Sequence, residues 1–362
     1  MDELLDKSAL AVNPGIEQPP VVNPDAIARI RKNRKKPLTV EEYVEGILEG
    51  QITVLSKAIT LVESFLDEHH EMAQAIIEKC LPYSGKSTRI GITGVPGAGK
   101  STFIEAFGKK ITSWGHKLAV LAIDPSSERS KGSILGDKTR MIELSCDPKA
   151  FIRPSPSAGS LGGVARKTRE TVILCEAAGF DTVFIETVGV GQSETAVHSM
   201  VDFFLLLMIS GAGDELQGIK RGIMEMANMI VINKADGNNV EKAMLAKAQY
   251  QSAMHLFPPA ASGWIPKVLT ASSKEKTGMG EIWATINKYL FLTENNGFFQ
   301  SNRQEQTKFW MYETINEALQ NSFYSNPQIR SLLKDYEDRV VSDRISSFVA
   351  AKELLNRYVE VT

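Results

Sequence analysis

The sequence RIGITGVPGAGKS, residues 89–101, joins a short apolar run to a glycine-rich loop. The run Arg89–Thr93 predicts a strand buried on both faces. Gly94 to Ser101 fit the pattern G-x-x-x-x-G-K-[ST], a loop that connects such a strand to a helix. The three parts together predict a phosphate-binding loop (P-loop) for a nucleoside triphosphate, without indicating which one.

The loop offers groups for phosphate and for a metal ion. Its glycines allow backbone conformations that aim successive N–H groups at phosphate oxygens, and the helix that begins near Gly99 adds its positive dipole end. We expect Lys100 to reach the β- and γ-phosphates and the Ser101 hydroxyl to bind Mg²⁺. The residues expected to bind nucleotide here are Gly94, Val95, Pro96, Gly97, Ala98, Gly99, Lys100, Ser101 and Thr102.

Five further apolar runs predict the rest of a sheet. They are Lys117–Ile123, Thr182–Glu186, Phe203–Ile209, Met229–Asn233 and Lys267–Thr270. The stretches between them are long enough for crossover helices, which predicts an α/β P-loop NTPase domain with a mostly parallel sheet over residues 87–297.

Helical patterns flank this domain. Residues 1–38 are rich in Pro and Asn and end in a basic run, which favours a flexible solvated arm, with a partner-binding arm as the alternative. Residues 39–86 predict a helical region, with apolar residues at helical spacing from Thr39 to Val62 and a second helix over His70–Cys80. Residues 298–362 predict a C-terminal helical region after a joint near Gly297. Its expected helices are about 304–322, 327–338 and 341–359.

The segment Asn233-Lys234-Ala235-Asp236 follows the apolar run Met229–Asn233 and matches the guanine-recognition motif N-K-x-D. Guanine presents two adjacent N–H donors that one carboxylate, Asp236, can accept. Adenine lacks both donors, so a buried carboxylate would lose its partners at a high cost. We expect Lys234 to lie along the base and Asn233 to tie the tetrad to neighbouring loops. Ser272 and Ser273 are expected in the supporting loop, although related GTPases usually carry Ala at the position of Ser273.

Three carboxylates are candidates for the metal region. Asp124 and Glu186 end predicted strands, where side chains of this fold face the ligand, and Asp137 follows nearby. Each could instead be a helix cap or turn former. Glu186 to Gly189 stand where many GTPases have D-x-x-G, whose glycine N–H senses the γ-phosphate, so Lys100, Glu186 and Gly189 are the catalytic candidates. No residue that orients the attacking water is evident.

Bulk properties limit the function classes. The 362 residues carry 41 Lys+Arg and 43 Asp+Glu, a balance that argues against a surface built for nucleic acid. The three cysteines form no C-x-x-C pair, which favours a reducing compartment. The N-terminus resembles no signal or transit peptide, and Phe203–Ile209 is too short to cross a bilayer. We expect a cytoplasmic protein that binds neither nucleic acid nor membrane.

Longer blocks of the sequence resemble the MeaB/ArgK/MMAA family of GTPases. They are Gly94–Thr102, Asp124–Met141, Phe151–Pro156, Leu161–Thr168, Glu186–Glu194 and Gly211–Glu225. The resemblance covers about residues 40–295 and, more loosely, the C-terminal helices. It implies a GTPase of the SIMIBI class that serves as a metallochaperone for adenosylcobalamin-dependent acyl-CoA mutases, chiefly methylmalonyl-CoA mutase.

The same resemblance implies further properties. Family members gate cofactor delivery, protect or reactivate the mutase, and form homodimers through C-terminal helices. In these proteins GTP hydrolysis controls when the cofactor is exchanged. Gly213–Arg221 resembles an additional switch loop, in which Asp214, Gln217 and Lys220 would respond to nucleotide and partner. A capped amphipathic helix is the alternative for this segment.

Three other functions remain open from the sequence. One is an ATPase or kinase of an amino-acid transport system, against which the N-K-x-D tetrad argues. Another is a nickel-insertion GTPase, although His69-His70 is the only adjacent pair among five histidines and suits a helix surface. The third is a scaffold that holds GTP only as a structural ligand.

Overall fold

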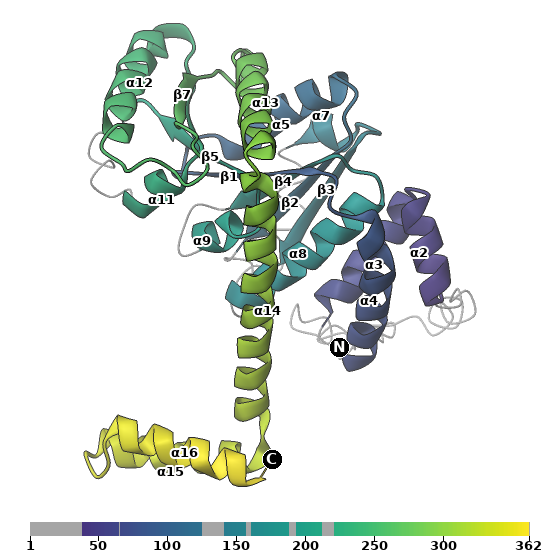
Figure 1. Ribbon diagram of the computed structural model, residues 1–362, viewed down its shortest axis with the longest axis vertical. Helices are drawn as coiled ribbons and strands as arrows, with labels where there is room; N and C mark the ends of the chain where they lie inside the picture. Colours follow the sequence, from purple (N-terminus) through teal and green to yellow (C-terminus); the bar gives the residue numbers. More distant parts are fainter. Residues whose placement is uncertain are drawn as a thin grey trace, which may run out of the picture. The chain divides into compact units, whose positions relative to one another are not determined.

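The computed structural model describes residues 38–64, 66–124, 141–156, 161–187, 193–211 and 221–361. Within them lies a seven-stranded sheet whose neighbouring strands are all parallel (Figure 1). Its spatial order is β3-β2-β4-β1-β5-β6-β7. The expected α/β fold is therefore confirmed. The strands are β1 (Thr88–Gly94), β2 (Leu118–Asp124), β3 (Ala150–Pro156), β4 (Thr182–Thr187), β5 (Phe203–Ile209), β6 (Met229–Asn233) and β7 (Lys267–Thr270).

The central strand β1 carries the glycine-rich loop at its carboxyl end. Thr88 to Ile92 pair with β4 on one side, and Ile90 to Gly94 pair with β5 on the other. Because the strands are parallel, their carboxyl ends meet at one edge of the sheet, where ligands bind in open α/β folds. The loop therefore lies at the same edge of the sheet as the carboxyl ends of β4 and β5.

The strand β3 was not among the predicted ones, whereas the other six confirm the predictions with small differences at their ends. Arg153, Pro154 and Pro156 interrupt its apolar pattern, so periodicity gives no strand signal. In the described residues β3 pairs only with β2, as an edge strand. Proline is tolerated there because an edge strand has N–H groups that need no ladder partner.

Helices cover both faces of the sheet. Buried residues of α5 and α13 pack on one face, and α8, α9, α11 and α12 contact strands from the other. The bounds of the helices and 3₁₀ turns before the C-terminal region are α2 (Val40–Leu48), α3 (Ile52–Glu63), α4 (Asp67–Cys80), η1 (Leu81–Tyr83), α5 (Lys100–Ser113), α7 (Ile142–Ser145), α8 (Leu161–Ala177), α9 (Ser193–His198), α11 (Arg221–Met226), η2 (Gly237–Asn239), α12 (Val240–Met254) and α13 (Met279–Asn295).

Three helical predictions need correction, the last being the final helix, which begins at Ser347 rather than near residue 341. The helical spacing between Thr39 and Val62 belongs to two helices, α2 and α3, because Gly50 adopts a left-handed φ of 73° between them. At the other end, the long helix begins at Phe298 rather than near residue 304, with Gly297 at its N-cap. The C-terminal helices are α14 (Phe298–Ser325), α15 (Pro327–Val341) and α16 (Ser347–Val361).

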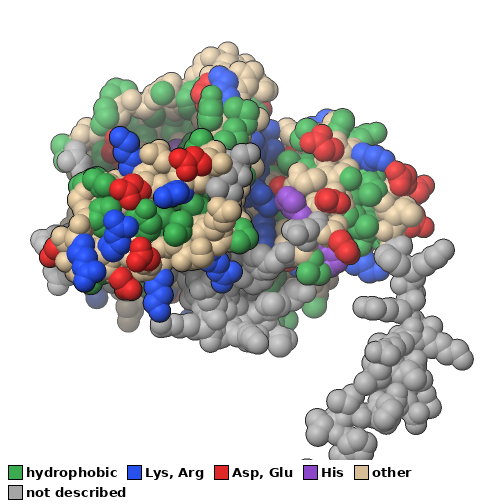
Figure 2. Space-filling view, turned by 90° about the horizontal axis from the view of Figure 1, so that it is seen from below, with side chains coloured by type: hydrophobic (Ala, Val, Ile, Leu, Met, Phe, Trp, Pro, Cys, Tyr) green, Lys and Arg blue, Asp and Glu red, His purple; other side chains and the backbone are tan. Residues whose placement is uncertain are grey.

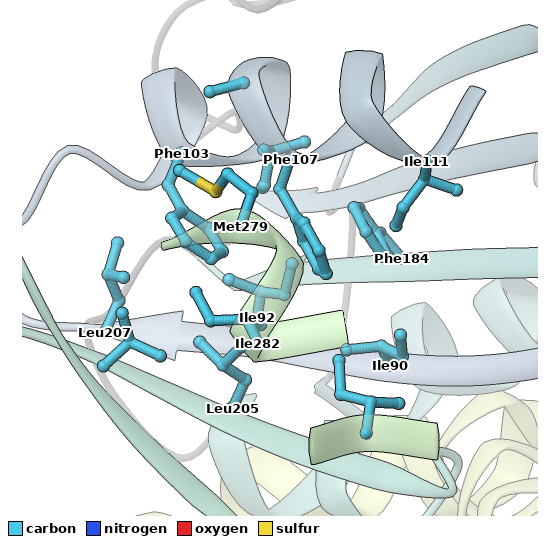
Figure 3. Packing of buried hydrophobic residues seen from close by; sticks show 14 of the residues in the cluster. Ile90, Ile92, Phe103, Phe107, Ile111, Phe184, Leu205, Leu207, Met279 and Ile282 are labelled. Carbon is cyan, nitrogen blue, oxygen red and sulfur yellow. The ribbon is translucent and has the colours of Figure 1, made fainter. Parts of the chain in front are cut away.

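The main core lies between α5, the sheet and α13 (Figure 3). Phe103 and Phe107 point from α5 onto the strands, and the Phe107 ring stacks on Phe184 with centroids 5.4 Å apart. Ile282 and its neighbours close the core from α13. Each fully buried side chain of this size contributes about 1.5–3 kcal/mol. This core fixes the first helix after the glycine-rich loop.

Two buried ion pairs, one of them made by α14 and the other by α8, lie at the edge of the sheet opposite the glycine-rich loop. Asp202 accepts two hydrogen bonds of 2.7 Å from Arg303 of α14. Glu176 of α8 accepts a hydrogen bond of 2.8 Å from Arg89 of β1. Both carboxylate side chains are 1% exposed, so buried charges attach α14 to the start of β5 through Asp202, and α8 to β1 through Glu176.

Candidate nucleotide-binding site

The glycine-rich loop has the backbone that its sequence requires. Gly97 and Gly99 adopt left-handed φ values of 77° and 83°, which disfavour other residues. A Cβ at Gly94 would lie 2.2 Å from the carbonyl oxygen of Leu207 on β5. Gly99 is the N-cap of α5, so the helix starts directly at the loop and its free N–H groups face the space inside it.

The side chain of Lys100 lies inside this loop. Its Nζ donates to the carbonyl oxygens of Gly94 at 2.9 Å and Val95 at 3.5 Å. Burial lowers the pKa of Lys100, while the negative charges of Glu186 and Glu194 act to raise it. An ammonium group in this position can bind the phosphate oxygens that the loop would surround.

Ser101 and Glu186 supply two oxygen groups next to Lys100. The Ser101 Oγ donates to Glu186 Oε1 at 3.4 Å, and Glu186 is 7% exposed at the end of β4. Next to Glu186 in sequence, Thr187 Oγ1 donates to Thr93 Oγ1 at 2.7 Å and joins the ends of β4 and β1. A hydroxyl and a carboxylate at this spacing are ligands that Mg²⁺ accepts, directly or through water.

Asn233 ties the base-recognition tetrad to the phosphate loop. Its Nδ2 donates to the Ala98 carbonyl at 2.8 Å, and its Oδ1 accepts from the Ser273 hydroxyl at 2.8 Å and the Ser273 N–H at 3.2 Å. The hydroxyl of Ser273, where Ala is usual, thus adds a hydrogen bond to Asn233. Lys234 follows with a left-handed φ of 58°, and its Cε lies 3.8 Å from the position of a Cβ at Gly99.

Asp236 is held by the loop after β7. Its Oδ2 accepts a hydrogen bond of 2.5 Å from Ser272, whose Oγ in turn accepts the Glu275 N–H at 3.0 Å. The Ala235 N–H donates to the Ala271 carbonyl at 3.0 Å. These contacts fix the carboxylate while one oxygen still has capacity for N–H donors of a base.

The structure brings the two sequence motifs together at one edge of the sheet, with Val95, Pro96 and Thr102 in the loop and the first turn of α5. Asp124 ends β2 at the same edge, but its side chain lies outside the described residues. Asp137, Gly189, Asp214, Gln217 and Lys220 also lie outside them. Among the residues that are described, no group of three or more His, Cys, Asp or Glu side chains could hold a metal ion.

Glu194 was missed as a site residue. The sequence shows it only as the residue that breaks a G-x-G-x-x-G pattern, yet its side chain is 4% exposed and acts on Lys100. The signal that could have found it is an acidic residue soon after the block Glu186–Gly189. Its electrostatic effect on Lys100 depends on the packing of α9, which sequence periodicity does not specify.

Known proteins resemble this chain over most of its length. The family model described as "Methylmalonyl Co-A mutase-associated GTPase MeaB" matches residues 55–328. A probable GTPase of Mycobacterium tuberculosis (strain H37Rv) is 47% identical over 317 residues, covering 88% of this chain and 94% of that protein. The mitochondrial methylmalonic aciduria type A homologue of Mus musculus is 46% identical over 329 residues, covering 88% and 79%.

A solved structure agrees with this relationship. The crystal structure of a LAO/AO transport system kinase has 37% sequence identity and a TM-score of 0.72, and covers 90% of this chain and 99% of that one. The family resemblance seen in the sequence is confirmed. With its phosphate loop and its N-K-x-D tetrad joined through Asn233, the chain belongs to the MeaB family of methylmalonyl-CoA mutase-associated GTPases, binds guanine nucleotide and hydrolyses GTP.

Proposed function

We propose that this GTPase gates adenosylcobalamin loading of an adenosylcobalamin-dependent acyl-CoA mutase, and protects or reactivates that enzyme. Methylmalonyl-CoA mutase is the chief candidate. The observation that carries the proposal is the match of residues 55–328 to a family described by its association with this mutase. The name of the mouse relative, which refers to methylmalonic aciduria, points to the same metabolic step.

The proposed binding of GTP uses the two joined motifs. The N–H groups of Gly97 to Ser101 and the ammonium of Lys100 would hold the phosphates, replacing the carbonyl oxygens that Lys100 now contacts. Asp236, oriented by Ser272, would accept both N–H donors of guanine. Lys234 would lie along the base, and Asn233 would keep the distance between base and phosphate sites fixed.

Mg²⁺ fits the oxygen groups beside the loop. Ser101 and Glu186 would hold it, and Asp124 and Asp137 are further candidates from the sequence. The ion would neutralise charge on the phosphates. Gly189 would sense the γ-phosphate, while Asp214, Gln217 and Lys220 would form the partner-responsive switch. Since no residue that orients water is evident, we expect slow intrinsic hydrolysis that the mutase accelerates.

The C-terminal helices would form a homodimer. Large hydrophobic side chains are exposed on them, including Leu319 at 59%, Phe348 at 86% and Val359 at 73%. Figure 2, seen from below the view of Figure 1, shows hydrophobic side chains between charged ones on this side of the molecule.

We further propose a cytoplasmic protein with the regions 1–38, 39–86, 87–297 and 298–362. In the described residues, none of the helices has the length and hydropathy to span a bilayer.

A turnover assay with and without mutase tests the proposal. GTP hydrolysis should be slow alone and faster with methylmalonyl-CoA mutase, and a GTP analogue should change the amount of mutase recovered with the protein. Fast turnover that no adenosylcobalamin-dependent mutase alters would contradict the chaperone role.

The alternatives make different predictions. An ATPase or kinase of a transport system would bind ATP more tightly than GTP. A nickel-insertion GTPase would bind nickel stoichiometrically. A structural scaffold would hold GTP without turnover, with or without the mutase.

A further inference from the structure

The base-recognition loop Lys234–Asp236 follows β6, the strand between β5 and β7. The loop after β7 holds it on one side, by the hydrogen bonds described above. The end of β5 reaches it on the other side. Ile209 is paired with Asn233 in the sheet, so the next residue of each strand, Ser210 and Lys234, lie at the same level. The loop therefore lies where contacts from both neighbouring strands can fix it.

The side chain of Asn239 makes the contacts on the β5 side. Its Nδ2 donates to the Lys234 carbonyl oxygen at 2.7 Å, and its Oδ1 accepts from the Ser210 hydroxyl at 2.7 Å. The backbone N–H of Asn239 also donates to the Asp236 carbonyl at 2.9 Å. Asn239 thus closes the base-recognition loop on itself and joins it to the end of β5.

The peptide group between Lys234 and Ala235 is held at both of its polar ends. Its carbonyl oxygen accepts from Asn239, and its N–H donates to the Ala271 carbonyl at 3.0 Å. In a trans peptide these two groups point in opposite directions, so the two hydrogen bonds fix the peptide plane from opposite sides. Ala235 leads directly to Asp236. The orientation of this peptide therefore determines where the Asp236 carboxylate lies relative to the base.

Lys234 has a backbone that needs such support. Its φ of 58° lies in the left-handed region, which is unfavourable for a residue with a Cβ. Gly237 of the same loop also has a left-handed φ, 51°, but has no Cβ to oppose it. A non-glycine residue keeps such a conformation only where the surrounding contacts impose it. Without the Asn239 amide, the Lys234 carbonyl loses a partner that holds it in this conformation.

We propose that Asn239 is a positioning residue for guanine recognition, which holds the Lys234–Ala235 peptide, and through it Asp236, against the end of β5. The inference rests on the proposed role of Asp236 as the acceptor for guanine, and it adds to that role a residue outside the N-K-x-D motif. Ser210 acts through Asn239, because its hydroxyl donates to the Asn239 side chain and not to the loop itself.

Affinities for GTP and for inosine triphosphate test this role. Inosine keeps the N1–H of guanine but lacks the 2-amino group, so it can make only one of the two hydrogen bonds to Asp236. Asn239→Ala should lower GTP affinity roughly 5-fold or more and inosine triphosphate affinity less, so the preference for GTP falls. At saturating GTP the kcat should stay as in wild type while KM rises, because the base is bound alike in the ground state and the transition state.

Three further variants sharpen the test. Asn239→Asp keeps the shape and the acceptor for Ser210 but offers the Lys234 carbonyl no N–H, so it should lower the GTP preference as Asn239→Ala does. Ser210→Ala should have a smaller effect, and no effect in a protein that already carries Asn239→Ala. The control Asn238→Ala changes an exposed side chain of the same 3₁₀ turn and should behave as the wild type does.

A purely structural role of Asn239 would give a different result. It would lower the stability measured by urea unfolding and leave the ratio of GTP to inosine triphosphate affinity unchanged, which would overturn the inference. Wild-type behaviour of Asn239→Asp, or additive effects of Ser210→Ala and Asn239→Ala, would overturn it as well. If Asn239→Ala does not fold, Asn239→Asp and Ser210→Ala give the same test.

The outcomes separate this inference from the proposed function. A wild-type protein that does not prefer GTP over inosine triphosphate would overturn the role of Asp236, and the inference with it. A wild-type preference that survives in Asn239→Ala would overturn only the inference. Failure of the mutase to bind or to accelerate hydrolysis would overturn the chaperone role and leave these affinities unaffected.

Discussion

At the scale of single residues, the hydroxyl of Ser272 connects the Asp236 carboxylate to the N–H of Glu275, so the carboxylate proposed to bind guanine is already held in place by the loop after β7. The two oxygens of Asp236 therefore have different roles. Oδ2 accepts the Ser272 hydrogen bond, which fixes the orientation of the carboxylate. Guanine would therefore meet an acceptor that is already oriented before the base binds.

Asp236→Asn should change nucleotide preference. The introduced amide can accept only one of the two guanine donors, so GTP affinity should fall by at least about 100-fold, since each hydrogen bond to a charged group contributes about 1.5–3 kcal/mol. Xanthine has a carbonyl at C2 and an N1–H, which match an amide, so xanthosine triphosphate should bind better than GTP. Equilibrium titrations with both nucleotides measure the two affinities. Equal loss for both would contradict the assignment.

Single residues of the site were predictable where the motif is local. The loop around Lys100 and the tetrad at Asn233 are contiguous in sequence, and each imposes its own backbone. The role of Ser273 was not predictable, because it depends on a hydrogen bond to Asn233 from a different strand end. Glu194 was not predictable either, because its effect on Lys100 depends on how α9 packs against the sheet.

At the scale of elements, the contact between β1 and α9 depends on the absence of a side chain at Gly91. Gly91→Ala would place a methyl group 2.9 Å from the Phe204 ring and 3.0 Å from Val197. Overpacking of this kind costs about 1–3 kcal/mol. Denaturant unfolding should show this loss of stability.

The matched control is Gly280→Ala on α13, where nothing lies within 4 Å of the added methyl group. This helical substitution should stabilise the protein by about 0.5–1 kcal/mol. If both variants changed stability in the same direction, the close contact at Gly91 would not be the cause.

The ion pair between β1 and α8 should make stability depend on acid pH. Burial acts to raise the pKa of Glu176, but hydrogen bonds and charge from Arg89, with Ser87 and the Gly85 N–H, outweigh it and lower the pKa below 4.5. The folded state therefore binds fewer protons than the unfolded chain in this range. The resulting stability is fully present above pH 4.5 and is lost as pH falls through the lower folded-state pKa.

Glu176→Gln should cost about 3–5 kcal/mol at pH 7, because it leaves the buried Arg89 without its partner charge. The difference from wild type should shrink below pH 4.5. Urea unfolding at several pH values measures it. The control Glu41→Gln removes an exposed ion pair with Lys79 and should have little effect at any pH.

Elements were predictable where burial imposes a simple pattern. β5 and β6 have the predicted bounds because both faces are covered and the apolar run is unbroken. The break between α2 and α3 was missed because the apolar spacing continues across it, while Gly50 supplies a turn that periodicity does not register. The prolines of β3 are tolerated because β3 lies at the edge of the sheet. That position depends on the order of all the strands, so the local sequence of β3 does not reveal it.

At the scale of the whole molecule, Arg303 joins α14 to the sheet. It contacts Asp202 twice at 2.7 Å and the carbonyls of Gly85 and Ser87 at 2.5 Å and 2.6 Å. Arg303→Leu should leave the buried Asp202 charge uncompensated, at about 3–5 kcal/mol. Limited proteolysis should then cut within residues 298–312 sooner than in wild type. Lys308→Ala, which removes only an exposed pair with Glu305, should not change the cutting.

The strand order has a consequence for synthesis of the chain. β1 emerges first from the ribosome, yet its two neighbours, β4 and β5, follow only after Thr182 and Phe203 have been made. Until then the apolar strands β1, β2 and β3 lack the partners that complete the sheet, and such surfaces are prone to aggregate. The strand β1, which carries the phosphate loop, therefore stays without a neighbouring strand for longer than the other strands do during synthesis. A nascent chain stalled before Phe203 should depend on molecular chaperones, whereas one that has passed residue 295 can close its sheet.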